Sequence, residues 1–161
     1  LLFEKDVFNE YAIFCELYVT VGSDKVKLKF KGKLDNFTVD NHNKLVVLND
    51  LKTSSKSASF FMGNTVKIKE GTRDKWVWYD GSFQKYRYYR QMGVYAWLLQ
   101  CYLKKEGIEG YKFKVNMIVV ETVPEYGNAI YPVVNKYIKK GLKEANKLLT
   151  LVAEWKLNSK M

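Results

Sequence analysis

The stretch LVVLNDLKT, residues 45–53, decides how this chain folds and what it carries, because an apolar strand here ends in an aspartate and a lysine. Asp35 lies fifteen residues before Asp50, in a second strand-like segment. Charged groups beside an apolar strand are costly to bury. Two carboxylates and a nearby ammonium group suit a site that holds a divalent cation next to a reactive water.

The two segments are predicted to form a β-hairpin. Residues 25–40 alternate apolar and polar side chains, as a half-buried strand does, and residues 44–52 form a second, more apolar strand. Asn41 and His42 between them fit the centre of a two-residue turn. We therefore interpret His42 as a turn residue rather than a metal ligand.

This turn sets the position of the acidic side chains. In a two-residue register, Asp35 lies opposite Leu48, and Asp50 is its diagonal neighbour, roughly 7–8 Å away between backbones. Side chains two residues apart share a strand face, so Lys52 joins Asp50. One metal ion could lie between the two carboxylates, with the ammonium group beside it. The alternative is an ordinary hairpin whose mouth carries a surface Asp-x-Lys, and a turn of another length would change the register.

A long helix is predicted downstream. Asp80 and Ser82 offer N-cap oxygens, and Gly107 offers a C-terminal stop. Glutamine and tyrosine side chains follow one stripe at helical spacing, namely Gln84, Tyr88, Gln91, Tyr95 and Tyr102. An amphipathic core helix explains much of this stripe. The two glutamines are less easily explained by a core helix, because a buried amide needs hydrogen-bond partners.

The order of three short motifs resembles the RecB-type branch of the PD-(D/E)XK nucleases. The motifs Gly-x-x-Asp, Asp-x-Lys-Thr and Gln-x-x-x-Tyr occupy residues 32–35, 50–53 and 91–95. The exonuclease VIII (RecE-like) group of recombination exonucleases is similar in two further segments, Tyr-Arg-Tyr at residues 86–88 and Tyr-Pro-Val at residues 131–133. The resemblance spans about residues 14–155, and the order and spacing of the motifs carry its specificity.

The resemblance implies a metal site. Asp35 and Asp50 would be metal ligands, with the backbone carbonyl of Leu51 as a third ligand. Lys52 would act on the nucleophilic water. The implied cofactor is Mg²⁺, with Mn²⁺ as a substitute.

Three further residues match the family less directly. Gln91 and Tyr95 would steady the site or the nucleic-acid strand near it. Glu16, on an expected first strand over residues 14–21, resembles a carboxylate that precedes the Gly-x-x-Asp strand in the family, and it has a structural alternative.

One departure concerns the start of the chain. Such nucleases have an earlier helix that brings a His or a Glu to the metal, whereas residues 1–11 contain only Glu4 and Glu10. The chain also starts with Leu1 rather than Met. We therefore expect a single nuclease domain over residues 1–161, with an upstream N-terminal helix and its metal ligand missing from a processed or truncated fragment.

Composition agrees with this interpretation without deciding it. A chain of 161 residues fits one domain, and no signal peptide or membrane-spanning run is visible. Cys15 and Cys101 are expected to be reduced, which fits a cytoplasmic protein, and two cysteines cannot bind a four-cysteine iron–sulfur cluster. The net charge of +10 suits a polyanionic partner.

The remaining segments complete an expected α/β fold, in which a mixed central β-sheet is flanked by helices in a restriction-endonuclease-like core. Strands are predicted over residues 111–122 and 128–134, and a lysine-rich helix over residues 135–157. Residues 53–80 form a mixed connection whose polar start, residues 53–57, could contact phosphates or be a plain loop. For the aromatic residues 75–79 we favour packing as an added strand over stacking on bases.

The expected function is magnesium-dependent hydrolysis of DNA by an exonuclease in recombination or phage DNA processing. The alternatives are an endonuclease of the same superfamily and a catalytically inactive nucleic-acid-binding module. DNA is the expected partner, no membrane is involved, and the cell is a bacterium or a phage-infected bacterium. The resemblance alone suggests a homo-oligomer and a single-strand annealing protein as further partners.

Overall fold

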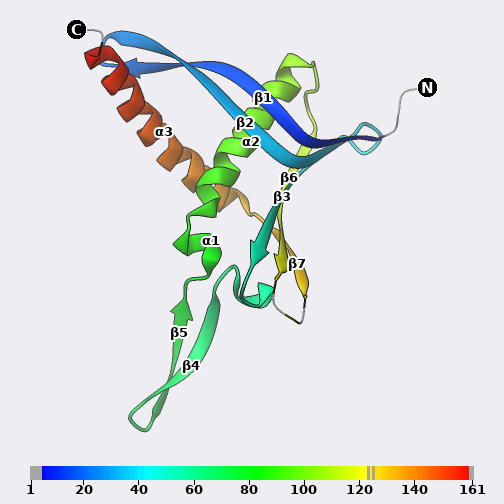
Figure 1. Ribbon diagram of the computed structural model, residues 1–161, viewed down its shortest axis with the longest axis vertical. Coiled ribbons are helices and arrows are strands. Elements are labelled where there is room, and N and C mark those ends of the chain that lie inside the picture. The colour runs from blue at the N-terminus through cyan, green and yellow to red at the C-terminus, as the bar shows by residue number, and fades with distance from the viewer. Residues whose placement is uncertain (1–4, 123, 125, 160–161) are drawn as a thin grey trace.

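A computed structural model describes residues 5–122, 124 and 126–159, and its centre is a mixed five-stranded sheet (Figure 1). The strand order is β1-β2-β3-β6-β7, in which only β3 and β6 are parallel. The strands are β1 (Lys5–Val21), β2 (Asp24–Asp40), β3 (Leu45–Ser54), β6 (Lys112–Glu121) and β7 (Asn128–Pro132). The first strand is longer than the predicted residues 14–21.

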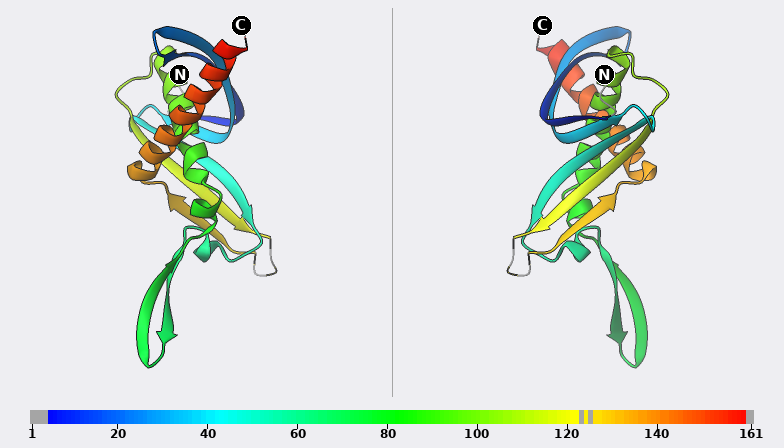
Figure 2. Two further views of the ribbon diagram at one scale, coloured as in Figure 1. Left: turned by 90° about the vertical axis from the view of Figure 1, so that its left-hand side faces the viewer. Right: turned by 90° about the vertical axis from the view of Figure 1, so that its right-hand side faces the viewer.

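Both long helices cover the same face of this sheet (Figure 2). They are α2 (Tyr88–Lys105) and α3 (Asn135–Asn158), preceded by the short helices η1 (Ala58–Phe60) and α1 (Ser82–Lys85). Apolar side chains of β2, β3, β6 and α2 form one buried core between the layers. The predicted α/β fold with a mixed sheet flanked by helices is confirmed. Among the described residues, no helix has the length and apolar character needed to span a membrane.

A second, two-stranded sheet projects from this body (Figures 1 and 2). It consists of β4 (Asn64–Glu70) and β5 (Arg73–Tyr79). The predicted added strand over residues 75–79 exists, but its expected packing is wrong, because in the described part of the chain the hairpin has no third strand and no covering helix. Trp76 and Trp78 are 67% and 54% exposed.

The turn between β2 and β3 is longer than predicted. Residues 41–44 form it, so Asp40 pairs with Leu45. The Asp40 side chain stabilises the wider turn, because its Oδ1 and Oδ2 accept hydrogen bonds from the backbone N and the Nδ2 of Asn43 at 2.8 and 2.9 Å. The predicted two-residue turn and its register are therefore wrong, while His42 does lie in the turn.

The corrected register brings the acidic residues closer together. Asn36 pairs with Asn49 at the last step of the β2–β3 ladder. Continuing that register by one residue places Asp35 opposite Asp50, rather than on a diagonal. Beyond this point β2 pairs only with β1, while β3 continues beside β6 as far as Ser54. The sheet therefore divides into a fork, and the two aspartates lie at its base.

The fork coincides with a change in the alternation of β2. Leu34 and Phe37 are both fully buried, although residues an odd number apart on a regular strand face opposite sides. The β1–β2 ladder passes from Asn36 to Leu34 without pairing Asp35. At Asp35 the strand therefore changes which alternate residues it buries, and the regular alternation predicted over residues 25–40 does not show this change.

The long helix predicted after Ser82 is interrupted. Arg87 adopts the left-handed conformation, with φ 55°, between α1 and α2. The predicted N-cap is also wrong, because Gly81 occupies that position and Asp80 instead accepts a hydrogen bond from Trp78 Nε1 at 2.9 Å. The predicted stop is confirmed: Gly107 has φ 73°, and α2 ends at Lys105.

Candidate active site

Asp50 is the centre of the candidate site. Its side chain is 1% exposed although it belongs to β3, whose other inward residues are mostly apolar. Gln91 Nε2 donates a hydrogen bond of 3.4 Å to Asp50 Oδ1. Asp50 Oδ2 is buried, and its polar partner is the Lys52 ammonium, whose Nζ lies at an ion-pair distance of 2.6 Å. A buried carboxylate oxygen of this kind is costly for stability and needs an explanation.

Asp35 is held next to Asp50 by the backbone of β3. Its Oδ2 accepts a hydrogen bond of 2.8 Å from the backbone N of Leu51. This contact crosses the base of the fork, where the β2–β3 ladder has already ended. One oxygen of Asp35 is therefore engaged by the backbone, and the carboxylate is oriented toward the segment that carries Asp50.

Lys52 connects the other groups of the site. Its side chain is 16% exposed, and its Nζ lies 3.4 Å from the backbone O of Leu51 and 5.3 Å from the centroid of the Tyr88 ring. Burial raises the pKa of the Asp50 carboxyl, the Lys52 ammonium opposes this rise, and the charge of Asp35 adds to it. Desolvation is the largest of these effects, so the Lys52 ammonium does not fully offset the cost of burying the Asp50 charge.

The two predicted helix residues differ in their relation to this centre. Gln91 contacts Asp50 directly. Tyr95 lies one turn further along α2, and both side chains line the same cleft. The Tyr95 ring lies beside Gly32, where a Cβ atom would stand 3.6 Å from the ring and 2.5 Å from Leu98 Cδ1. The glycine of the first motif is thus explained by the close approach of α2 to β2.

The remaining candidate carboxylate lies elsewhere. Glu16 is exposed and forms an ion pair of 2.6 Å with Lys27, which fits its structural alternative. Among the residues that the structure describes, no group of three or more His, Cys, Asp or Glu side chains could hold a metal ion. Glu4 lies outside the described residues. Sequence reasoning placed Tyr88 on the helical stripe but missed its contact with Lys52.

The donors at the fork are of the kind that a hard cation prefers. Asp35 and Asp50 supply carboxylate oxygens, and Leu51 supplies a backbone carbonyl that now faces the Lys52 ammonium. Mg²⁺ is commonly bound by one or two carboxylates and keeps several waters. The burial of Asp50 is the observation that favours a cation here, because the Lys52 ammonium at 2.6 Å from Oδ2 does not offset the full cost of desolvating the carboxylate.

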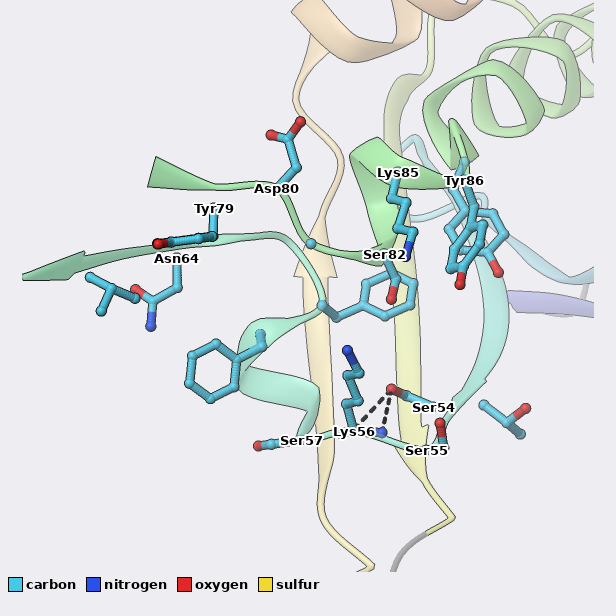
Figure 3. A pocket seen from close by; sticks show the side chains of 16 residues that line it. Ser54, Ser55, Lys56, Ser57, Asn64, Tyr79, Asp80, Ser82, Lys85 and Tyr86 are labelled. Atoms are coloured by element: carbon cyan, nitrogen blue, oxygen red, sulfur yellow. Dashed lines mark hydrogen bonds between the residues drawn. The ribbon is translucent and has the colours of Figure 1, made fainter. Parts of the chain in front are cut away.

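Two clefts flank the fork and share Tyr86 and Tyr88. One cleft, of about 800 Å³, lies between the β1–β2 hairpin and the start of α2, and Gln91 lines it. The other, of about 740 Å³, lies between the end of β3 and the root of the β4–β5 hairpin (Figure 3). Lys56 and Lys85 point into this second cleft, and Ser54 Oγ is hydrogen-bonded to the backbone of Lys56. The predicted polar segment after β3 therefore lines a basic cavity.

Comparison with known proteins adds support for the fold. No family model matches the chain, and no curated protein matches it. Among solved structures, the chain is similar to a crystal structure of a "Putative exonuclease" from Eubacterium rectale, with a TM-score of 0.53 and 16% sequence identity. The match covers 87% of this chain and 41% of the other chain, so it spans less than half of that protein's length. At this identity the match shows a shared fold.

Proposed function

We propose that the chain is a magnesium-dependent DNA nuclease that hydrolyses phosphodiester bonds, most consistent with an exonuclease. The observation that carries this proposal is the fork, where Asp35, Lys52 and Gln91 surround the buried carboxylate of Asp50. An arrangement this costly to fold is typical of sites where charge serves chemistry rather than stability. The fold shared with the Eubacterium rectale protein is consistent with it.

Each residue has a part that follows from its contacts. Asp35 and Asp50 would hold the cation together with the carbonyl of Leu51. Gln91 fixes the orientation of Asp50 through its Oδ1. When bound, Mg²⁺ would lower the pKa of a water and neutralise charge on the phosphate. The Lys52 ammonium, now beside Asp50 Oδ2, would turn to the attacking water or to the negative charge that develops on the phosphate.

The surroundings of the fork suit a nucleic-acid strand. The shared ridge of Tyr86 and Tyr88 offers aromatic rings, and Lys56 and Lys85 offer positive charge in the cleft beyond it. These groups could contact bases and phosphates on either side of the bond that is cleaved. The homo-oligomer and the annealing-protein partner implied by the family resemblance belong to the same proposal.

A catalytically inactive nucleic-acid-binding module is the second candidate. It is favoured by one observation, the lack of a third metal-ligating side chain near Asp35 and Asp50 among the described residues. Such a module would bind DNA through the same basic surfaces but would leave the phosphodiester bonds intact.

Digestion of end-labelled linear DNA and closed circular DNA, first with Mg²⁺ and then with a chelator, separates these functions. An exonuclease degrades the linear DNA in Mg²⁺ and spares the circles, because it requires an end. An endonuclease nicks the circles. An inactive module leaves both substrates intact while it still shifts them on a gel, with affinity that falls as salt rises.

A further inference from the structure

The outer face of β2 carries a row of lysines. Every second residue in the first part of the strand is an exposed lysine, and this lysine row consists of Lys25, Lys27, Lys29, Lys31 and Lys33. The alternate residues Val26 and Leu28 are buried against α3, so the lysines beside them lie on the face of the strand away from that helix. At strand spacing, neighbouring lysines are about 7 Å apart and the row is about 27 Å long.

The charge of this row is only partly balanced. Lys27 pairs with Glu16 and Lys33 pairs with Glu10, both across the ladder on β1. Lys25, Lys29 and Lys31 form no ion pair with any residue in the part of the chain that the structure describes. Lys29 lies opposite Glu16 in the ladder, so the row carries five positive charges against the two carboxylates of Glu10 and Glu16. Regularly spaced ammonium groups with a net positive charge on one strand face are complementary to the phosphates of a nucleic-acid backbone.

Exposed aromatic rings accompany the row on the neighbouring strand. Phe14 and Tyr18 are 72% and 64% exposed, and they pair with Lys31 and Lys27 in the β1–β2 register. Paired residues lie on the same face of a sheet, so rings and ammonium groups are side by side. Large exposed rings offer stacking platforms to unpaired bases, whereas the bases of a duplex are stacked on one another.

The row leads to the candidate active site. Lys31 and Lys33 line the cleft that also contains Gln91. Gln91 in turn donates its hydrogen bond to the buried Asp50. From the fork, the row extends along the β1–β2 hairpin to its far end, which lies near the C-terminal end of α3 (Figure 1).

We propose that the outer face of the β1–β2 hairpin binds single-stranded nucleic acid, with the lysine row on the phosphates and with Phe14 and Tyr18 stacked on bases. This inference deepens the proposed nuclease function, because it assigns the surface that guides an unpaired strand to or from the fork. It concerns binding alone, so it can stand or fall independently of cleavage.

The chain contains a matched control for the effect of bulk charge. On α3, Lys139, Lys143 and Lys147 are exposed at helical spacing and lie outside the hairpin. Replacing these three lysines by glutamine removes the same charge as replacing Lys25, Lys29 and Lys31 by glutamine. The two triple variants therefore separate a specific track from a general attraction to a basic protein.

The test is fluorescence anisotropy with a labelled oligo-dT of about 20 nucleotides in the presence of a chelator, titrated over roughly 50–200 mM salt. The triple variant in the lysine row should bind more weakly, and its slope of log affinity against log salt should be smaller by about 2, since each lost phosphate contact removes about 0.7. The α3 variant should retain the wild-type slope. Circular dichroism and thermal denaturation check that both variants are folded.

The rings are tested separately from the charges. Phe14→Leu and Tyr18→Leu should each weaken oligo-dT binding by roughly tenfold at constant salt, without changing the slope. Binding of a duplex of the same length should depend much less on the two rings. Three results would each overturn the proposal. Both lysine variants could lose the same affinity for oligo-dT, the row variant could bind like the wild type, or the two aromatic variants could bind like the wild type. If the wild type binds oligo-dT through the lysine row but does not cleave DNA, the proposed nuclease function is contradicted and the binding proposal stands.

Discussion

Two buried carboxylates on neighbouring parallel strands have opposite surroundings. Glu121, at the end of β6, is 7% exposed and accepts hydrogen bonds from the backbone N of Ala58 at 2.6 Å, from Ser57 Oγ at 3.2 Å and from the backbone N of Gly127 at 3.3 Å. The Ala58 hydrogen bond contributes most to lowering the pKa of Glu121. In contrast, Asp50 on β3 has one long hydrogen bond from Gln91 and one ion pair with Lys52, and burial raises its pKa despite that ammonium.

This contrast fits a structural role for Glu121 and the proposed ligand-binding role for Asp50. Glu121 is saturated with donors and fastens η1 and the β6–β7 connection to the sheet, so its charge stabilises the fold. Asp50 has fewer partners in the same fold, one amide and one ammonium group, which is expected where a carboxylate must accept a ligand that is not part of the chain. The predictions below test whether the two carboxylates really differ in this way.

The largest effect is expected for Lys52→Ala. If the ammonium group acts on the attacking water or on the developing phosphate charge, turnover should fall by about 100-fold or more. DNA affinity should change little, because the side chain is mostly buried. Single-turnover cleavage and gel-shift titration measure the two quantities, with the exposed Lys147→Ala as control. A large loss of affinity with normal turnover would make Lys52 a phosphate contact instead.

A smaller effect is expected for Gln91→Ala. This change removes the hydrogen bond to Asp50 Oδ1, so cleavage should fall by roughly tenfold while the protein stays folded. Tyr95→Phe is the matched comparison, because it keeps the ring that lies beside Gly32 and removes only the phenol. We expect Tyr95→Phe to cleave nearly normally. Normal cleavage by Gln91→Ala would remove this contact from the active site.

Glu121 should control stability with the pH dependence of a carboxylate whose pKa is lowered. Such a group stabilises the fold fully above its unfolded pKa, and the contribution is lost as pH falls through the lower folded pKa. Urea denaturation should therefore show that Glu121→Gln is less stable than the wild type at neutral pH, and the difference should shrink in acid. A constant difference at all pH values would show that the charge of Glu121 is unimportant.

Asp50 should show the opposite sign. Because its folded pKa is raised, its contribution is fully present below its unfolded pKa and is lost as pH rises through the folded pKa. In metal-free buffer, the stability of the wild type relative to Asp50→Asn should therefore decrease as pH rises through that range. The same urea titrations measure it, and a difference that grows with pH would place Asp50 in the same class as Glu121.

The smallest effect concerns the polar contacts that hold the strands behind the fork. Asn49 Nδ2 donates to Asn36 Oδ1 at 2.7 Å, and Asn49 Oδ1 accepts from Asn116 Nδ2 at 3.0 Å. Asn49→Ala should lower the free energy of unfolding by about 1–2 kcal/mol. Cleavage per folded molecule should remain close to normal. A loss of cleavage as large as that of Lys52→Ala would mean that the ladder also shapes the site.

Much of the fold followed from local pattern. The alternation in β2, the apolar run of β3 and the glycine stop after α2 depend on neighbouring residues, so the sequence predicts them directly. The misplaced features depend on tertiary contacts instead. The β2–β3 turn is set by the Asp40 and Asn43 side chains, and the break at Arg87 has neither proline nor glycine next to it, so local signals did not mark it. The exposure of Trp76 cannot be seen from a strand pattern, because it depends on the absence of a covering layer.

The candidate site was predicted in composition but not in detail. Motif spacing identified Asp35, Asp50, Lys52 and Gln91, and the structure brings these four together, whereas Tyr95 lies further along the cleft. The sequence could not predict that Gln91 and Lys52 are the polar partners of the buried Asp50, because this depends on the division of the sheet at Asp35. The division of the sheet coincides with the point where β2 changes the face that it buries. In the sequence, this change is visible only as two polar residues, Asp35 and Asn36, between the buried Leu34 and Phe37.

The most direct test of the central claim is calorimetric titration of the protein with Mg²⁺ and with Mn²⁺. The wild type should bind the cation, and Asp50→Asn should bind it at least about tenfold more weakly. Glu121→Gln should bind it like the wild type, because Glu121 lies outside the fork and its oxygens already accept hydrogen bonds from Ser57, Ala58 and Gly127. Denaturation in the absence of metal shows that each variant is folded. Equal affinity in the wild type and in Asp50→Asn would contradict the assignment of the fork as a metal site.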